Sequence, residues 1–206
     1  MIKNILFDLG GVIITLDPKQ AEARFKEIGL ADADRRLNTY TQSGLFGDLE
    51  LGKIDAEGFR AGLSEIIGHE VTYEQCLYGW LGYCKDLPQR NLETLLRLRS
   101  EGYRIVLLSN TNPYMVSWVM SDNFDGKGHS LSHYMDSMYM SYKCGVMKPD
   151  RRFFQIVLDG EGIDPAETLF LDDGQRNVES AAALGINTYL VENGSDWTKD
   201  IYDFLK

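Results

Sequence analysis

The segment ILFDLGGV, residues 5–12, joins a short apolar run to an aspartate and two glycines. A run without polar interruption, such as Ile5-Leu6-Phe7, is typical of a strand buried on both faces of a parallel sheet. Asp8 stands where this predicted strand ends. Because ligands of open α/β sheets bind at the carboxyl ends of the strands, Asp8 is the first candidate for a functional side chain.

Three further apolar runs of this kind follow along the chain, each ended by polar residues or glycine: IVLL at 105–108, LFL at 169–171 and TYLV at 188–191. We expect these strands also to be buried on both faces. Apolar residues with helical spacing precede them, at 92–98, 153–158 and 178–184. Strands that alternate with helices predict βαβ units, and therefore an α/β fold with a Rossmann-like, doubly wound parallel sheet.

Residues 17–88 follow a different pattern. Their apolar residues have helical spacing, as in Ala21-Phe25-Ile28 and Phe59-Leu63-Ile66-Ile67, and no strand-like run interrupts them. This pattern predicts a helical domain inserted directly after the first strand. The expected domains are a core at 1–16 and 89–206 and a helical insert at 17–88.

Charge and cysteine content narrow the classes of partner. The formal net charge of −10 disfavours nucleic acid and anionic membranes, whereas a small phosphorylated molecule can bind if a cation and a lysine neutralise it locally. No apolar stretch has the length of a membrane span. The three cysteines are odd in number and form no C-x-x-C pair, which predicts a reducing, cytoplasmic location. The sequence leaves the oligomeric state open.

Polar side chains follow the predicted strands where a ligand is expected. They are Asp8 after the first run, Ser109 and Asn110 after the second, and Asp172 and Asp173 after the third, while Lys148 precedes the helical segment at 153–158. Carboxylates this close repel one another unless a hard cation lies between them, and oxygen ligands favour Mg²⁺. An ionised carboxylate can attack phosphorus while a lysine and a hydroxyl hold the phosphoryl oxygens. The pattern therefore predicts phosphoryl transfer through an aspartyl phosphate.

Four segments in chain order resemble the four motifs of the haloacid dehalogenase (HAD) superfamily: FDLGGV at 7–12, LLSNTN at 107–112, KPD at 148–150 and LFLDDGQRNV at 169–178. The resemblance implies a Mg²⁺-dependent phosphatase whose helical insert is the family's cap. It further implies that Asp8 is the nucleophile, that Ser109 and Asn110 bind the phosphoryl group and that Lys148 neutralises its charge. The metal ligands that it implies are Asp8, Asp172, Asp173 and the Gly10 carbonyl. Among these Asp173 would be the direct carboxylate ligand, supported by Asn177.

The sequence departs from the family pattern at Gly10. The family usually has a second aspartate here, which protonates the leaving group and then activates water. General acid–base catalysis is worth about 10²–10⁴-fold, and glycine cannot supply it. Three interpretations remain open: the leaving group needs less help, a group from the cap or Asp17 substitutes, or the protein binds its ligand without rapid turnover.

The predicted function is hydrolysis of a phosphomonoester of a small metabolite, such as a sugar phosphate. The alternative is a catalytically attenuated HAD protein that binds a ligand or regulates. A 2-haloacid dehalogenase is less favoured, because that chemistry relies on a different first motif and needs no metal. Four residues of the cap are candidates for contact with the leaving group, although a helix surface explains them equally well: Phe46, Asp48, Glu50 and Lys53.

Overall fold

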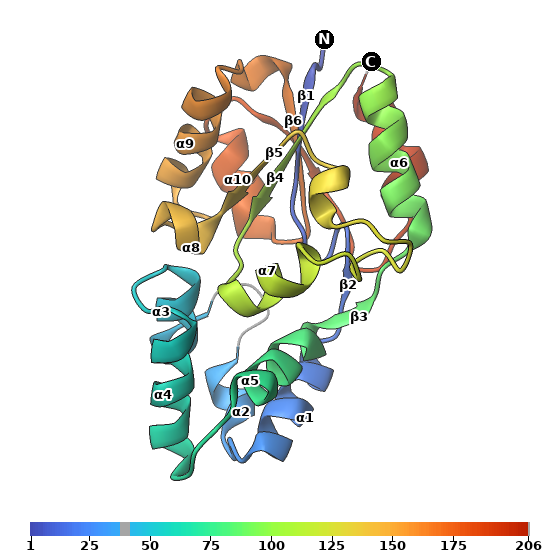
Figure 1. Cartoon of the computed structure of the whole chain (residues 1–206). Helices are drawn as coiled ribbons and strands as arrows, with labels where there is room; N and C mark the ends of the chain where they lie inside the picture. The colour runs from blue at the N-terminus through green and yellow to red at the C-terminus, as the bar shows by residue number, and fades with distance from the viewer. Residues whose placement is uncertain (38–41, 206) are drawn as a thin grey trace.

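A five-stranded parallel sheet forms the centre of the protein, in the order β5-β4-β1-β6-β7 (Figure 1). The structure is a computed structural model that describes residues 1–37 and 42–205. The strands are β1 (Asn4–Phe7), β4 (Arg104–Ser109), β5 (Ser137–Met140), β6 (Thr168–Asp172) and β7 (Asn187–Leu190). Since β1 pairs in parallel with both β4 and β6, the residues that follow these three strands emerge side by side at one edge of the sheet.

Helices cover both faces of this sheet. Helices α6 (Gln89–Ser100) and α11 (Trp197–Phe204) pack on one face, and α9 (Arg151–Glu161) and α10 (Gln175–Ala182) pack on the other (Figure 1). Successive residues of β1 point to opposite sides, so Phe7 contacts the Trp197 ring at 5.3 Å between centroids while Leu6 joins the cluster of α9 and α10. The predicted doubly wound α/β fold is therefore confirmed.

The two edge strands differ from the sequence-based expectation. The run at 188–191 does form β7, but its predicted burial on both faces is wrong, since the Leu190 side chain is 46% exposed. β7 has a neighbour on one side only, so its surface is partly open to solvent. β5 was not predicted at all; Ser137–Met140 is an edge strand in which only Met140 is fully buried.

Five helices lie between two short strands, β2 (Thr15–Leu16) and β3 (Cys84–Asp86), which pair in antiparallel fashion. We call these helices the helical insert: α1 (Pro18–Ile28), α2 (Ala33–Arg36), α3 (Gly44–Glu50), α4 (Ala56–Ile67) and α5 (Tyr73–Trp80). β3 lies within 17–88, where the sequence shows no strand-like apolar run, and its three residues indeed carry none. The division into a core and a cap stays a prediction.

The insert has an apolar centre of its own. Ala21, Phe25 and Ile28 are buried, as their helical spacing predicts, and so are Phe59 and Leu63. The continuation of the second pattern is only partly buried, because the Ile66 side chain is 39% exposed.

Contacts between the insert and the core hold it over the carboxyl edge of the sheet. Helix α7 (Pro113–Val119) follows β4 and places Tyr114 in the apolar cluster of the insert, where the Tyr114 hydroxyl donates to the Ala56 carbonyl at 2.6 Å. Next to the insert lies α8 (Ser141–Cys144), and three 3₁₀ turns complete the fold at Leu81–Tyr83, Leu131–His133 and Pro165–Glu167. None of the helices in the described ranges has both the length and the apolarity needed to cross a bilayer.

Candidate active site

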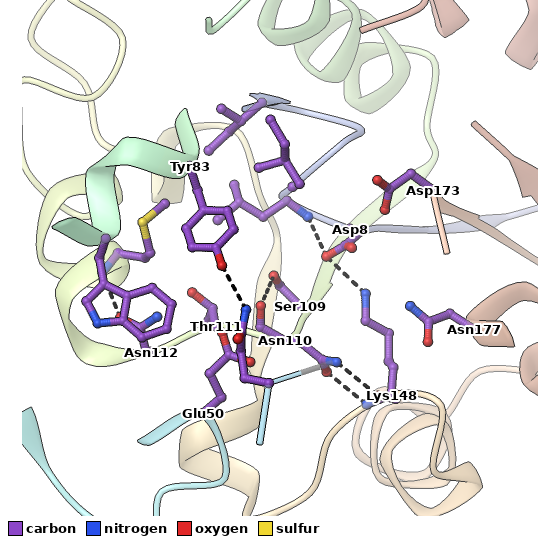
Figure 2. A pocket seen from close by; sticks show the side chains of 17 residues that line it. Asp8, Glu50, Tyr83, Ser109, Asn110, Thr111, Asn112, Lys148, Asp173 and Asn177 are labelled. Atoms are coloured by element: carbon purple, nitrogen blue, oxygen red, sulfur yellow. Dashed lines mark hydrogen bonds and ion pairs between the residues drawn. The ribbon is translucent and has the colours of Figure 1, made fainter. Parts of the chain in front are cut away.

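A cavity of about 90 Å³ lies between the carboxyl edge of the sheet and the helical insert. It has room for about three water molecules at roughly 30 Å³ each. The side chains that line it from the core come from the ends of β1 and β4 and from the loops before α9 and after β6 (Figure 2): Asp8, Ser109, Asn110, Lys148 and Asp173 among others. The fold thus brings together residues far apart in the sequence.

Lys148 connects two of the carboxylates. Its side chain is fully buried, with Nζ 2.9 Å from Asp8 Oδ1 and 2.5 Å from Asp172 Oδ2. Burial acts to lower the pKa of this ammonium group, but Asp172 and Asp8 outweigh it and raise the pKa above its usual value. Lys148 is therefore a charged donor inside the site, able to bind a phosphoryl oxygen.

The Asn110 side chain fixes the Lys148 backbone. Asn110 Nδ2 donates to the Lys148 carbonyl at 2.9 Å, and the Lys148 N–H donates to Asn110 Oδ1 at 2.8 Å (Figure 2). The amide predicted to bind phosphate is thus occupied in positioning the lysine. Ser109 is 1% exposed and lines the cavity beside it.

Three carboxylates form a cluster suited to a cation. One oxygen each of Asp8, Asp172 and Asp173 lies within 4.8 Å of the others. Burial raises the pKa of Asp8 to about 8, where Lys148 lowers it and the two neighbouring carboxylates add to the rise. Burial and Asp172 raise the pKa of Asp173 to about 6. A divalent cation would relieve this repulsion, and the oxygen-only donor set fits Mg²⁺.

The two aspartates at the end of β6 have different surroundings. Asp172 Oδ1 accepts hydrogen bonds from the Gly174 N–H at 2.7 Å and from Asn177 Nδ2 at 2.8 Å, while Oδ2 accepts from Lys148. Both Asp172 oxygens are therefore engaged by the protein. The Asp173 carboxylate lies instead against the turn after β1, where Gly11 is its neighbour.

Position 11 requires glycine for two reasons, its backbone conformation and the closeness of the Asp173 side chain. Its φ is +75°, and a Cβ atom there would lie 2.2 Å from Asp173 Oδ2. Gly11→Ala is expected to displace the Asp173 carboxylate and to weaken Mg²⁺ activation of phosphate release by about 10–100-fold, the usual effect of disturbing the support of a metal ligand. The measurement is phosphate release as a function of Mg²⁺ concentration.

Gly126→Ala is the matched control for Gly11→Ala. Gly126 also has a positive φ, +69°, but a Cβ there has no neighbour within 4 Å. This control should show the backbone strain of a left-handed residue, about 1–2 kcal/mol, without a change in Mg²⁺ dependence. An unchanged Mg²⁺ dependence in Gly11→Ala would contradict the contact with Asp173.

Gly10 and Asp17, the two residues discussed for the missing acid, lie in different places. Gly10 lines the cavity, and a Cβ added there would lie 3.1 Å from the Leu16 side chain. Asp17 begins α1, where its carboxylate accepts from the Gln20 N–H at 3.1 Å. Asp17 is not among the described residues that line the cavity.

The far side of the cavity is lined by polar and apolar residues of the insert and of the segment after β4. Of the four cap candidates, Phe46 is buried in the insert and Asp48 forms an exposed ion pair with Lys53 at 2.9 Å, whereas Glu50 lines the cavity. Burial raises the pKa of Glu50 to about 8; the Asn112 side chain opposes this and Asp8 adds to it. Four further lining residues had not been singled out from the sequence: Gln42, Tyr83, Thr111 and Asn112.

Asn112 could have been predicted as a site residue, because it belongs to the LLSNTN motif. It closes the LLSNTN segment and starts α7, where its Oδ1 accepts from the backbone N–H groups of Tyr114 and Met115. Its Nδ2 atom is buried and has no hydrogen-bond partner among the described residues. A buried donor of this kind is ready for a ligand oxygen.

Comparisons with known proteins agree with this geometry. A family model of haloacid dehalogenase-like hydrolases matches residues 2–185. A D-ribitol-5-phosphate phosphatase from Bacteroides thetaiotaomicron is 43% identical over 201 residues, which are 98% of this chain and 97% of that protein.

Two solved structures are also similar over nearly their whole length. A predicted HAD-like family hydrolase from Porphyromonas gingivalis is 41% identical with a TM-score of 0.95, covering 100% of this chain and 98% of the other. A HAD family enzyme from Bacteroides thetaiotaomicron, in complex with magnesium and inorganic phosphate, is 37% identical with a TM-score of 0.89, covering 97% and 98%.

These findings confirm the phosphatase class and the use of Mg²⁺ that the sequence predicts. Three of the four motifs lie at the ends of β1, β4 and β6, the KPD motif immediately precedes α9, and the family match spans most of the chain. This chain therefore belongs to the haloacid dehalogenase-like hydrolases.

Proposed function

We propose that this enzyme hydrolyses the phosphomonoester of a small sugar or polyol, and that D-ribitol 5-phosphate is the first substrate to test. The observation that carries the proposal is a cavity with two unlike sides. Asp8 and Lys148 offer a phosphoryl site at the carboxyl edge of the sheet, while Gln42 and Tyr83 of the insert and Asn112 after β4 offer polar groups elsewhere in the cavity. The similarity to a D-ribitol-5-phosphate phosphatase supports the polyol.

The residues of this chain support an attack by Asp8 on phosphorus. Asp8 Oδ1 is held by the Leu9 N–H at 2.7 Å and by Lys148, which fixes the direction of the carboxylate. Lys148 and the Ser109 hydroxyl would hold the phosphoryl oxygens as negative charge shifts on them. Water would then cleave the aspartyl phosphate and regenerate Asp8.

The carboxylate cluster supports a metal site made by Asp8, the Gly10 carbonyl and Asp173, with Asp172 positioning Lys148 rather than facing the ion. Mg²⁺ bound there would neutralise the phosphoryl oxygens and the neighbouring carboxylates. Asn177 would support the site through its hydrogen bond to Asp172.

We further propose that residues 17–88 act as a cap over the core formed by 1–16 and 89–206. The insert lies at the carboxyl end of the sheet, in the lower part of Figure 1, and its residues line the cavity. This position supports the role, because a cap that closes over a phosphoryl site excludes water and selects the leaving group. A cytoplasmic location is supported by the three free cysteines, Cys76, Cys84 and Cys144. Dehalogenation stays disfavoured, because a cluster of three carboxylates calls for a cation that this chemistry does not need.

The test is phosphate release from D-ribitol 5-phosphate, D-ribose 5-phosphate and a nucleoside monophosphate, each with Mg²⁺ or with excess chelator. Chelation is expected to lower turnover by at least about 10²-fold, because the clustered carboxylates of Asp8, Asp172 and Asp173 repel the substrate phosphate without a cation. Added Mg²⁺ should restore it. Binding of Mg²⁺ and inorganic phosphate without release from any ester would instead favour the attenuated binding protein.

A further inference from the structure

Gly10 leaves the proposed reaction without an evident proton donor. Breaking the ester bond of an alkyl phosphate produces an alkoxide, so a positioned general acid is worth about 10²–10⁴-fold. The Gly10 backbone cannot transfer a proton, and Asp17 lies at the start of α1 rather than in the cavity wall. The donor must therefore come from another element that reaches the leaving oxygen.

The geometry of in-line displacement says where that donor has to be. The leaving oxygen departs on the side opposite to the attacking carboxylate, so it faces away from Asp8 and toward the helical insert. Figure 2 shows Glu50 and Tyr83 on one side of the pocket and Asp8, Lys148 and Asp173 on the other. Among the described residues that line the cavity, the carboxylic acids are Asp8, Asp173 and Glu50. The first two are assigned to attack and to the metal.

We propose that Glu50, the last residue of α3, is the general acid and base that this enzyme uses in place of an aspartate at position 10. The inference rests on the proposed phosphatase reaction and names a catalytic residue for it.

The position of Glu50 is fixed by close contacts on both sides of it. Two residues later the chain passes directly over the core at Gly52, where a Cβ atom would lie 2.0 Å from the Tyr142 carbonyl oxygen. One turn earlier, at Gly47, a Cβ would lie 2.6 Å from the Gln42 carbonyl oxygen. The end of α3 is therefore seated on α8 of the core, and Glu50 is 7% exposed.

The surroundings of Glu50 favour its protonated form near neutral pH. Burial raises its pKa to about 8, with a contribution from the Asp8 charge, while the Asn112 side chain and Lys148 oppose the rise. The other titratable group on this side is Tyr83, whose pKa burial raises well above its usual value, so it is a much weaker acid. Asn112 lines the same wall, and because its side chain already favours the ionised form of Glu50, it can stabilise the carboxylate that forms.

In the two steps of the reaction Glu50 first gives up one proton and then takes one back. In the first step Asp8 forms a bond to phosphorus, the bond from phosphorus to the ester oxygen breaks, and Glu50 gives its proton to that oxygen, which leaves as an alcohol. In the second step Glu50, now a carboxylate, takes a proton from water as the water oxygen attacks phosphorus. The aspartyl bond breaks, inorganic phosphate leaves, and Asp8 and protonated Glu50 are restored.

Two esters distinguish these steps in Glu50→Gln, which keeps the shape but cannot transfer a proton. With D-ribitol 5-phosphate, kcat/KM should fall by about 10²–10⁴-fold, because the alkoxide leaves without an acid. With 4-nitrophenyl phosphate, whose leaving group needs no proton, Asp8 should still be phosphorylated. The variant should therefore show a burst of one nitrophenol per site followed by slow turnover, because hydrolysis of the aspartyl phosphate lacks its general base.

The pH profile adds a readout that a structural role would not move. In the wild type, kcat/KM for the alkyl ester should fall above pH about 8 as Glu50 loses its proton, and this fall should be missing from Glu50→Gln. Asp48→Asn is the matched control, because Asp48 lies on the same helix, is exposed and pairs with Lys53. It should behave as the wild type with both esters.

Each other outcome overturns the assignment. A Glu50→Gln variant that turns over 4-nitrophenyl phosphate at the wild-type rate without a burst would make Glu50 a contact for substrate hydroxyls. Loss of the burst together with all turnover would make its role structural, and a selective loss in Tyr83→Phe instead would move the acid to Tyr83. A wild-type enzyme that releases phosphate from neither ester would remove the proposed function itself, which is a different failure.

Discussion

Asp8→Asn is expected to lower phosphate release by at least about 10³-fold, because an amide oxygen does not form the phosphoenzyme and the residual rate comes from binding and electrostatics alone. The local structure should survive the change. Asp8 is one of three clustered carboxylates, so removing its charge relieves repulsion, and Lys148 keeps its contact with Asp172 at 2.5 Å. The loss should therefore appear in turnover and not in the midpoint of thermal unfolding.

The measurement is steady-state phosphate release with Mg²⁺, together with a search for phosphate bound covalently to Asp8 in the acid-quenched wild type. Asp17→Asn serves as the control. Asp17 accepts a hydrogen bond at the start of α1, so that variant should lose about 1 kcal/mol of stability or less and keep its turnover. Phosphoenzyme that still forms in Asp8→Asn would show that another residue attacks phosphorus.

The central strands and their functional ends could be predicted from the sequence for a simple physical reason. The middle residues of β1, β4 and β6 are buried on both faces and are apolar, and the sequence shows this pattern directly. The edge strands obey a weaker constraint. β5 and β7 are only partly buried, so their residues need not be apolar on both faces, and one of the two strands was missed.

The candidate site divides in the same way. Asp8 follows β1, and Asp172 and Asp173 lie at the end of β6, so the parallel pairing of β1 with β6 is enough to bring these carboxylates together. Lys148 lies between α8 and α9. Asp172 and Asp173 differ in the hydrogen bonds that each carboxylate accepts, and the sequence alone does not show these bonds.

The position of Glu50 in the cavity could not be predicted from the sequence. Glu50 lies at the end of α3, between the buried Leu49 and the half-buried Leu51. From the sequence alone, Asp48 in the same helix is an equal candidate for the general acid. What separates the two is the docking of the helix end on the core: the residue that faces the cavity is Glu50, and Asp48 pairs with Lys53 at the surface. That choice depends on how two distant segments pack, and a single sequence carries no direct signal of it.

Lys148→Met is expected to remove both stability and activity. The Lys148 and Asp172 side chains are both 0% exposed, so the variant leaves a buried carboxylate without its cation, which costs about 3–5 kcal/mol in the free energy of unfolding. Activity measured on the folded fraction should fall by a further factor of about 10² or more, because the phosphoryl oxygens lose a charged donor. Urea unfolding and phosphate release are the two measurements.

Mg²⁺ separates this explanation from a simple packing defect. The unpaired charge after Lys148→Met is negative and lies in the carboxylate cluster, so Mg²⁺ should raise the urea midpoint of the variant more than that of the wild type, where Lys148 already neutralises Asp8 and Asp172. Lys53→Met breaks an exposed pair with Asp48 and should change stability by less than about 1 kcal/mol, with no response to Mg²⁺. Equal Mg²⁺ responses in Lys148→Met and the wild type would mean that packing of the lysine stem, rather than its charge, is what the folded protein loses.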